Sequence, residues 1–322
     1  MDYEGVICRP PMELGAFLLP VTVGCTHNRC TFCTFYKDTG FRVIPLEAVE
    51  AELARAAGSG RAPRRIFLGD GNPFTLGVDR LMEILTMIRR YFPAMPPVCM
   101  DATVANIAAK SDGELSALAG AGVEELYVGI ECGVEETLVR LRKGFTLEQA
   151  KEQAVRLDRA GIACGAHLML GTGGAGRGEE TALRTAELLN ELRPRDAINV
   201  EMFVHRGTEL HRQVQAGQFQ PASALESLEE ERLLLENIRV PMKYDGFHGW
   251  HEFHVWGPLP EKSAAMLKKL DGAIAWCRRE LESPGVRTLD ELQRVRVHYD
   301  GTARQDAGQV SAPCGRIPEP CA

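Results

Sequence analysis

The sequence predicts an α/β fold built on a parallel sheet. Three features indicate it. Strand-like and helix-like segments alternate six times between residues 16 and 237, glycine and polar residues follow several of the strand-like segments, and a cysteine-rich loop follows the first of them. Alternation of this kind gives parallel strands joined by right-handed crossovers. Doubly wound sheets and barrels both satisfy the pattern, and hydrophobic periodicity does not separate them.

Strands and helices are expected where composition and periodicity change together. The helical pattern is clear after residue 80, because Leu81, Ile84, Leu85 and Ile88 fall on one stripe. Strands are expected at residues 16–23, 65–69, 98–102, 125–130, 162–170 and 197–203. Helices are expected at residues 45–58, 81–92, 114–121, 135–141, 147–160, 179–192, 224–237 and 263–282.

The chain is expected to have three parts. Residues 1–240 carry the strand–helix repeat, and residues 241–283 hold a segment rich in His and Trp followed by a helix. Residues 284–322 look weakly structured, apart from a possible strand at 294–299. A length of 322 residues suits one large domain with a small addition.

Charge and composition exclude some classes of partner. The net charge of −7 makes nucleic acid an unlikely partner. No apolar run approaches the roughly 18 residues that a membrane span requires, and we see no signal-peptide pattern. Ten cysteines in such a chain predict a reducing, cytoplasmic location.

The most informative stretch is residues 24–36, in which Cys25, Cys30 and Cys33 lie within nine residues. Thiolates this close in one loop bind a metal more often than they form disulfides. A structural zinc site takes four protein ligands. Three thiolates on a 4Fe–4S cluster leave one iron open to a small molecule. A zinc loop completed by a distant Cys or His is the alternative.

The spacing C-x4-C-x2-C resembles the C-x3-C-x-aromatic-C motif of the radical S-adenosylmethionine (radical SAM) superfamily. Phe32 stands at the aromatic position, and the first gap is one residue longer than usual. The resemblance implies an incomplete (β/α)6 TIM-like barrel formed by residues 1–240, closed by residues 241–283, with active-site groups at the carboxyl ends of the strands.

The resemblance also implies the chemistry. Its cofactors would be a 4Fe–4S cluster held by the three cysteines and S-adenosyl-L-methionine (SAM), which is cleaved reductively to a 5′-deoxyadenosyl radical. That radical would take hydrogen from a small-molecule or peptide substrate. An external one-electron donor such as flavodoxin or ferredoxin would be required. The rival interpretation is a non-catalytic iron–sulfur or zinc-binding redox or sensor protein.

Residues after the second and fourth strands match cofactor-binding segments of that superfamily. Gly69 and Asp70 lie in a Gly-Asp-Gly segment where its members bind the amino group of SAM, although Asp-Gly-Asn is also ordinary turn chemistry. By resemblance Glu131 would hold the ribose hydroxyls and Lys143 the methionine carboxylate. The alternative for Glu131 is a surface carboxylate.

Further candidate cofactor contacts lie after the fifth strand and within the sixth. Gly171 begins a glycine-rich turn that resembles the wall for adenosine in the same superfamily. Val200, with Phe203, would pack on the adenine, although core packing explains both equally well.

Two residues are candidates for catalysis. Asp101 ends the third strand, where a carboxylate would face the barrel opening or cap a helix. His248, His251 and His254 recur at every third residue, and His251 is the candidate in a lid facing the substrate. In one strand His248 and His254 would share a face. Aromatic packing and a metal site are the alternatives for this segment.

Overall fold

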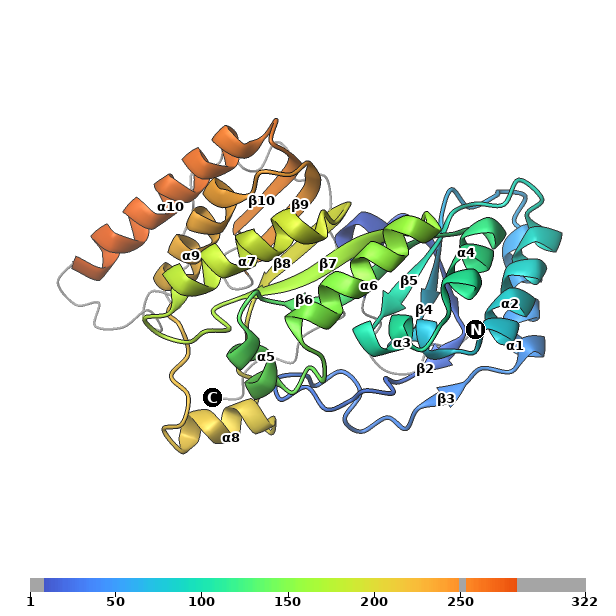
Figure 1. The fold of residues 1–322 in the computed structure, drawn as a ribbon, viewed down its shortest axis with the longest axis horizontal. Helices are drawn as coiled ribbons and strands as arrows, with labels where there is room; N and C mark the ends of the chain where they lie inside the picture. Colours follow the sequence, from blue (N-terminus) through green and yellow to red (C-terminus); the bar gives the residue numbers. More distant parts are fainter. Residues whose placement is uncertain (1–8, 249–252, 283–322) are drawn as a thin grey trace. The chain divides into compact units, whose positions relative to one another are not determined.

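The computed structural model describes residues 9–248 and 253–282 of the chain (Figure 1). The chain divides into two compact units. Unit 1 contains residues 9–129 and 142–165, and unit 2 contains residues 130–141, 166–248 and 253–282. The candidate tail at 284–322, with its possible strand at 294–299, lies outside the described residues.

Unit 1 is built on parallel strands. They lie in the order β1 (Phe17–Pro20), β4 (Ile66–Gly69), β5 (Val98–Ala102) and β6 (Val123–Glu131), the last of which continues into unit 2. All residues of β4 are buried, which is why the sequence of this strand is apolar throughout. After β1 the chain forms a small antiparallel pair, β2 (Thr22–Val23) with β3 (Arg42–Val43).

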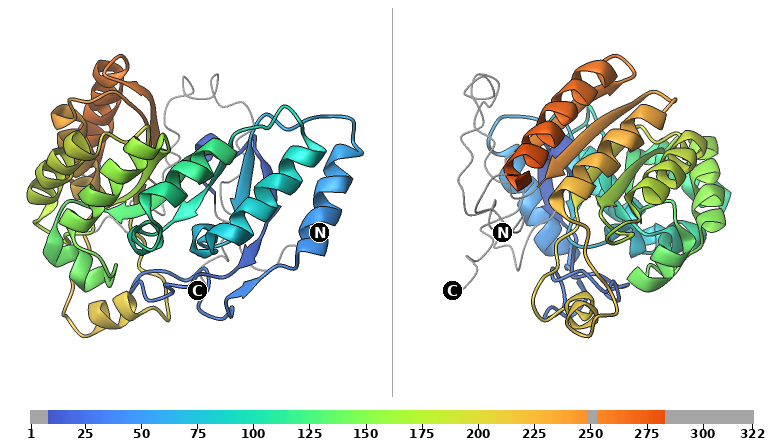
Figure 2. Two further views of the ribbon diagram at one scale, coloured as in Figure 1. Left: turned by 45° about the vertical axis from the view of Figure 1, so that its right-hand side comes forward. Right: turned by 90° about the vertical axis from the view of Figure 1, so that its left-hand side faces the viewer.

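The helices of unit 1 follow the strands in the expected alternation. Helix α2 (Val78–Tyr91) packs between α1 (Leu46–Ala57) and α4 (Asp112–Ala121), and α4 packs against α6 (Leu147–Ala160) (Figures 1 and 2). A short helix, α3 (Val104–Ala108), also packs against α6. Capping boxes begin α4 and α6, because Ser111 pairs with Glu114 and Thr146 with Gln149.

Unit 2 combines parallel and antiparallel strands. Most of β7 (Ala163–Leu170) belongs to it, β8 (Asp196–Glu201) pairs in parallel with β9 (Met242–His248), and β9 pairs antiparallel with β10 (Phe253–Leu259). Its helices are α5 (Glu135–Leu141), α7 (Gly178–Leu192), α8 (Glu209–Gln215), α9 (Ala224–Asn237) and α10 (Ser263–Glu282). Helix α9 packs between α7 and α10 (Figure 1).

The predicted α/β alternation is confirmed, with element ends shifted by a few residues. The helix expected at 224–237 and the one expected at 263–282 have those bounds. Two short helices, α3 and α8, were not expected. The hairpin of β9 and β10 was also not expected. In β9, buried residues alternate with more exposed ones, but Asp245 and Gly246 are poor strand formers and obscure this alternation in the sequence.

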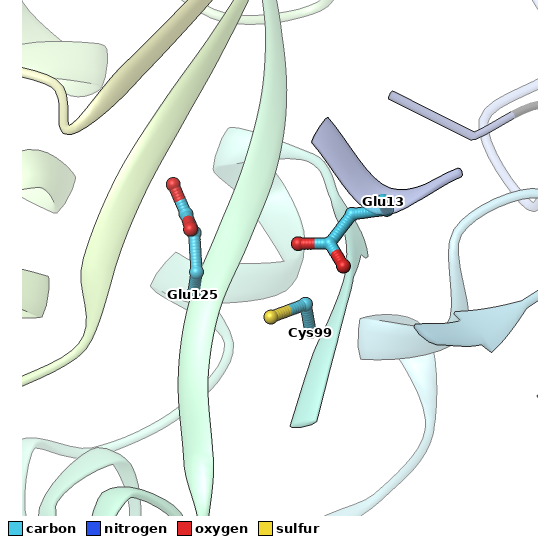
Figure 3. A group of neighbouring side chains, drawn as sticks. All are labelled: Glu13, Cys99 and Glu125. Carbon is cyan, nitrogen blue, oxygen red and sulfur yellow. The ribbon is translucent and has the colours of Figure 1, made fainter. Parts of the chain in front are cut away.

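A buried cluster of charged groups lies where the strands of unit 1 begin. Glu13, Cys99 and Glu125 are fully buried, and one ligand-type atom of each lies within 4.8 Å of the others (Figure 3). The Arg65 guanidinium nitrogen Nη2 lies 2.7 Å from Glu13 Oε1, 2.8 Å from Cys99 Sγ and 3.5 Å from Glu125 Oε2. The Tyr127 hydroxyl also donates to Glu13, at 2.9 Å.

This cluster is an ion-pair network and not a metal site. A cation at its centre would occupy the place of Arg65 Nη2, which already contacts all three ligand-type atoms. Burial raises the pKa of the Cys99 thiol far above its usual range, so Cys99 is a neutral partner there. The guanidinium compensates two buried carboxylates, which otherwise strongly oppose folding.

We therefore predict that Arg65→Ala destabilises the protein by about 3 kcal/mol, because it leaves Glu13 and Glu125 buried without this cation. Urea unfolding followed by circular dichroism measures the change. Arg65→Lys keeps the positive charge but not the planar guanidinium group, so its loss of unfolding free energy should be smaller. A loss below about 0.5 kcal/mol for Arg65→Ala would show that the network does not stabilise the fold.

Candidate active site

The three cysteines lie on the loop between β2 and β3 of unit 1. Cys25, Cys30 and Cys33 are partly exposed, and none forms a disulfide. The loop is held closed by Asn28, whose side-chain amide donates to the Tyr36 carbonyl at 2.6 Å. Asn28 has a φ of 34°, in the left-handed region that asparagine tolerates better than most residues. The cysteines therefore project from a loop that is fixed by its own side chains.

The spacing of the sulfurs bears on the choice of metal. A tetrahedral zinc site brings its thiolate sulfurs to about 3.8 Å from one another, given a Zn–S bond of about 2.3 Å. Among the described residues, Glu13, Cys99 and Glu125 are the only trio with ligand atoms all within 4.8 Å, so at least two of the loop sulfurs lie further apart than that. A 4Fe–4S cluster takes each thiolate on a different iron and suits such a donor set.

Main-chain contact ties the cysteine loop to the segment after β4. Gly71 has a φ of +73°, and a Cβ there would stand 1.8 Å from the carbonyl oxygen of Gly24. No side chain fits in that space, so glycine is required on both steric and conformational grounds. Gly24 directly precedes Cys25 in the sequence. The position of the first cysteine therefore depends on this contact.

Side chains reinforce that contact. The Tyr36 hydroxyl donates to Asp70 Oδ1 at 3.1 Å and accepts from the Gly71 amide at 3.0 Å. Asn72 Oδ1 accepts from the Thr26 amide at 3.0 Å. Tyr36 and Asn72 were not predicted from the sequence, because neither lies in a recognisable motif and both bond residues at least 34 positions away.

The candidate cofactor residues of this segment have different environments. Asp70 is 7% exposed, and its carboxylate accepts from the phenol of Tyr36. Gly69 ends β4, where a Cβ would stand 3.0 Å from a methyl group of Leu18. Main-chain groups of both glycines are already hydrogen-bonded within the protein, because the Gly69 carbonyl accepts from the Val21 amide and the Gly71 amide donates to the Tyr36 hydroxyl.

Lys143 lies against the cysteine loop. Its Nζ is 4.0 Å from Cys30 Sγ and 5.8 Å from the centre of the Phe32 ring. The predicted carboxylate-binding lysine, the predicted aromatic residue and one predicted cluster ligand are therefore neighbours in unit 1. An ammonium group here favours an anionic ligand beside the cysteines. Asp101, a further polar candidate of unit 1, is partly exposed near the end of β5.

The remaining candidates are in unit 2. Glu131 ends β6 with a φ of +68° and is 6% exposed, so it is not a surface carboxylate. Val200 on β8 is 36% exposed, which excludes the interpretation that it is buried in the core. His251 lies outside the described residues.

The glycine-rich turn of unit 2 is held by side chains from two helices. The Gly171 amide donates to Glu230 Oε2 at 3.1 Å, and the Gly176 amide donates to Glu226 Oε1 at 2.7 Å. Arg140 donates to the Thr172 carbonyl. Burial raises the pKa of Glu230 to about 8, so this carboxyl group is largely protonated at neutral pH. The turn is therefore a fixed feature rather than a mobile loop.

The histidine segment forms part of the β9–β10 hairpin. Contrary to the expectation for a single strand, His248 and His254 lie on opposite faces, because they belong to two paired strands and His254 pairs with Phe247, the neighbour of His248. His248 is buried and bonds Glu231 of α9 at 2.7 Å. The His254 imidazole, one-third exposed, bonds Asp245 and stacks on Phe247 with ring centres 4.3 Å apart.

Comparison with known proteins identifies the family. The model described as the radical SAM superfamily matches residues 19–189, which is more than half of the 322-residue chain. The chain belongs to the radical SAM superfamily. Membership implies a 4Fe–4S cluster and SAM as cofactors, as predicted, and an enzyme fold whose specific reaction is undefined. The matched range includes the cysteines, Glu131 and Lys143 but ends before Val200.

Two further similarities agree with this membership. The heme chaperone HemW of Mycobacterium tuberculosis (strain ATCC 25618 / H37Rv) is 25% identical over 285 residues, which cover 86% of this chain and 70% of that protein. The structure of the Escherichia coli coproporphyrinogen III oxidase HemN, a radical SAM enzyme, matches with a TM-score of 0.51 at 16% identity. The match covers 69% of this chain and 50% of HemN.

The second match confirms the predicted fold class, a radical SAM partial TIM-like barrel. A third similarity is to the radical SAM methyltransferase TsrM of Kitasatospora setae, with a TM-score of 0.46 and 19% identity. It covers 57% of this chain and 36% of TsrM. The chain thus spans half or less of these two solved structures. In the described part of the chain, no helix combines the length and apolar character that crossing a membrane requires.

The contact between Gly71 and Gly24 predicts that Gly71→Ala disrupts the cysteine loop, because the added methyl group overlaps the Gly24 carbonyl. After anaerobic reconstitution, the variant should bind less than a quarter of the iron of the wild-type protein. Gly77→Ala is the matched control, since a Cβ there has nothing within 4 Å. Full iron content in Gly71→Ala would refute this account of the loop.

Proposed function

We propose that this protein is a radical SAM enzyme that cleaves SAM reductively and abstracts hydrogen from a small-molecule or peptide substrate. The observation that carries the proposal is the position of Lys143 Nζ, 4.0 Å from Cys30 Sγ beside the ring of Phe32. When bound, the cluster and SAM supply one-electron cleavage of a carbon–sulfur bond, giving methionine and a 5′-deoxyadenosyl radical. The protein positions both reactants and excludes water.

In unit 1 the roles follow from residue chemistry. Cys25, Cys30 and Cys33 bind three irons of the cluster and leave the fourth open. Lys143 holds the methionine carboxylate through its charge, and Phe32 covers the apolar side of the same region. The turn of residues 69–71 is proposed to receive the amino group, with Asp70 fixed by Tyr36 to shape that turn.

In unit 2 the roles are those of an adenosine site. Glu131 accepts hydrogen bonds from the ribose hydroxyls, and its buried carboxylate would be well suited to a diol. The turn at Gly171 presents backbone to the adenosine, and Val200 offers an apolar contact to the adenine. Asp101 and His251 are proposed for the substrate side, Asp101 as a carboxylate facing the barrel opening and His251 as a lid residue.

The wider arrangement is also proposed. Residues 1–240 form the catalytic core and residues 241–283 its closing segment, with residues 284–322 as an appendage. An external one-electron donor such as flavodoxin or ferredoxin serves the cluster. The described cysteines are thiols without disulfides, which suits a reducing, cytoplasmic location.

The proposal predicts 5′-deoxyadenosine formation. Reconstituted protein, reduced anaerobically with dithionite and given SAM, should form 5′-deoxyadenosine, measured by liquid chromatography with mass detection. Cys30→Ala should form none. Lys143→Gln should raise the KM for SAM about 10- to 100-fold, because it removes a charge-assisted hydrogen bond.

Lys268→Gln is the matched control for Lys143→Gln, since Lys268 is exposed on α10 and its loss removes an equal charge. It should leave the KM unchanged. An intact cluster that yields no 5′-deoxyadenosine would favour the non-catalytic iron–sulfur interpretation. Zinc in place of iron and sulfide would favour the zinc-binding one.

Haem binding is a second candidate function. The relative with 25% identity over 86% of this chain is named a heme chaperone. His254 offers a partly exposed imidazole, held by Asp245 and flanked by Trp256, which is 64% exposed. Histidine is a common axial ligand of haem iron, and an exposed aromatic ring suits a flat macrocycle.

Titration with hemin tests this second function. Saturable binding with a shifted Soret absorbance is expected, and His254→Ala should weaken it at least fivefold. His211→Ala on α8 is the control, because His211 is also a partly exposed histidine but belongs to another element. If wild-type protein shows only unsaturable hemin adsorption, this candidate is rejected.

A further inference from the structure

The first gap of the cysteine loop contains a histidine that reaches toward a distant segment. His27 is two residues after Cys25, yet its Nε2 lies 2.8 Å from the carbonyl oxygen of Arg142, 115 positions along the chain. An imidazole N–H donates to this acceptor, which places the ring proton on Nε2. The hydrogen bond therefore joins the cysteine loop to the turn that carries Lys143.

The Cε1 edge of the imidazole lies beside the same turn. A Cβ on Gly144 would stand 3.1 Å from His27 Cε1 and 3.7 Å from Nδ1. Glycine at 144 leaves room for the ring, and its φ of +75° also favours glycine. The Nε2 nitrogen is thus occupied by the Arg142 carbonyl, and the Cε1 edge of the ring fits beside Gly144.

The turn that His27 contacts has an unusual backbone. Arg142 has a φ of +55° and Gly144 a φ of +75°, so two left-handed residues enclose Lys143. A non-glycine residue in this region carries a conformational cost and persists only when its surroundings hold it. The hydrogen bond from His27 to the Arg142 carbonyl acts on this residue directly.

The loop is anchored on its other side by the next residue. Asn28 donates to the Tyr36 carbonyl at 2.6 Å, and Lys37 Nζ donates to the Asn28 carbonyl at 2.8 Å. His27 and Asn28 are thus adjacent residues of the four-residue gap with different roles. Asn28 fixes the cysteine loop internally, and His27 joins it to the turn that carries Lys143. The gap is one residue longer than the C-x3-C spacing, and His27 lies in it.

We propose that His27 is a positioning residue for SAM: it holds the turn of residues 142–144 so that the Lys143 ammonium stays beside Cys30 and Phe32. This inference rests on the proposed role of Lys143 in binding the methionine carboxylate. The role assigned to His27 is to act through Lys143 and not by contact with SAM. Its effect therefore belongs to SAM affinity and not to the chemical step.

A double-mutant cycle tests the inference. On reconstituted protein, His27→Ala should weaken SAM binding, measured by equilibrium dialysis, about five- to tenfold, as expected for loss of one positioning hydrogen bond. The iron content and the rate at saturating SAM should remain within twofold of wild type. His27→Gln keeps an N–H donor and should restore most of the affinity. In the Lys143→Gln background, His27→Ala should have no further effect.

A second readout does not depend on the loaded enzyme. Amide hydrogen exchange in the segment 141–146, measured before reconstitution, should become faster in His27→Ala than in wild type. His211→Ala on α8 is the control for loss of a partly exposed imidazole and should change neither readout.

The outcomes separate the two proposals. If Lys143→Gln leaves SAM affinity unchanged, the proposed role of Lys143 fails. If Lys143→Gln weakens binding but His27→Ala does not, the positioning role of His27 fails. Equal effects of His27→Ala in the presence and absence of Lys143 would show that His27 acts by another route. A large loss of iron in both His27 variants would make His27 a residue of the cluster loop itself.

Discussion

The site depends on a contact between two stretches of backbone. The carbonyl of Gly24, directly before the first cysteine, lies where a side chain at Gly71 would stand. The cysteine loop and the turn after β4 can approach this closely only because residue 71 is glycine. Tyr36 and Asn72 then fix the same two segments through side-chain hydrogen bonds. The cluster ligands and the proposed site for the amino group of SAM are thereby set in one rigid arrangement.

The sequence was informative where chemistry is local. The three cysteines are recognisable by spacing alone, and the strand–helix alternation predicts the fold class and most element bounds. Helix α2 shows why, since its buried residues Leu81, Ile84, Leu85 and Ile88 are spaced by the helical period. Lys143 was also predicted, but by family resemblance. Its nearness to Cys30 depends on a contact across 113 residues of chain, which no local pattern encodes.

The features that were not predicted from the sequence depend on contacts between distant parts of the chain. His27, Tyr36 and Asn72 act through hydrogen bonds to residues far along the chain, and each is an ordinary residue type in its local context. The β9–β10 hairpin was missed because its alternating burial is obscured by Asp245 and Gly246. Gly246 has a reason of its own, since a Cβ there would stand 1.9 Å from the carboxylate of Glu231. Such packing reasons appear only in three dimensions.

The central claim is that SAM binds at the cluster held by Cys25, Cys30 and Cys33. Electron paramagnetic resonance of the dithionite-reduced, reconstituted protein tests it most directly, because a ligand on the open iron changes the electronic structure of the cluster. Addition of SAM should shift the g values of the reduced 4Fe–4S signal. A reduced cluster whose spectrum is identical with and without saturating SAM would contradict the account.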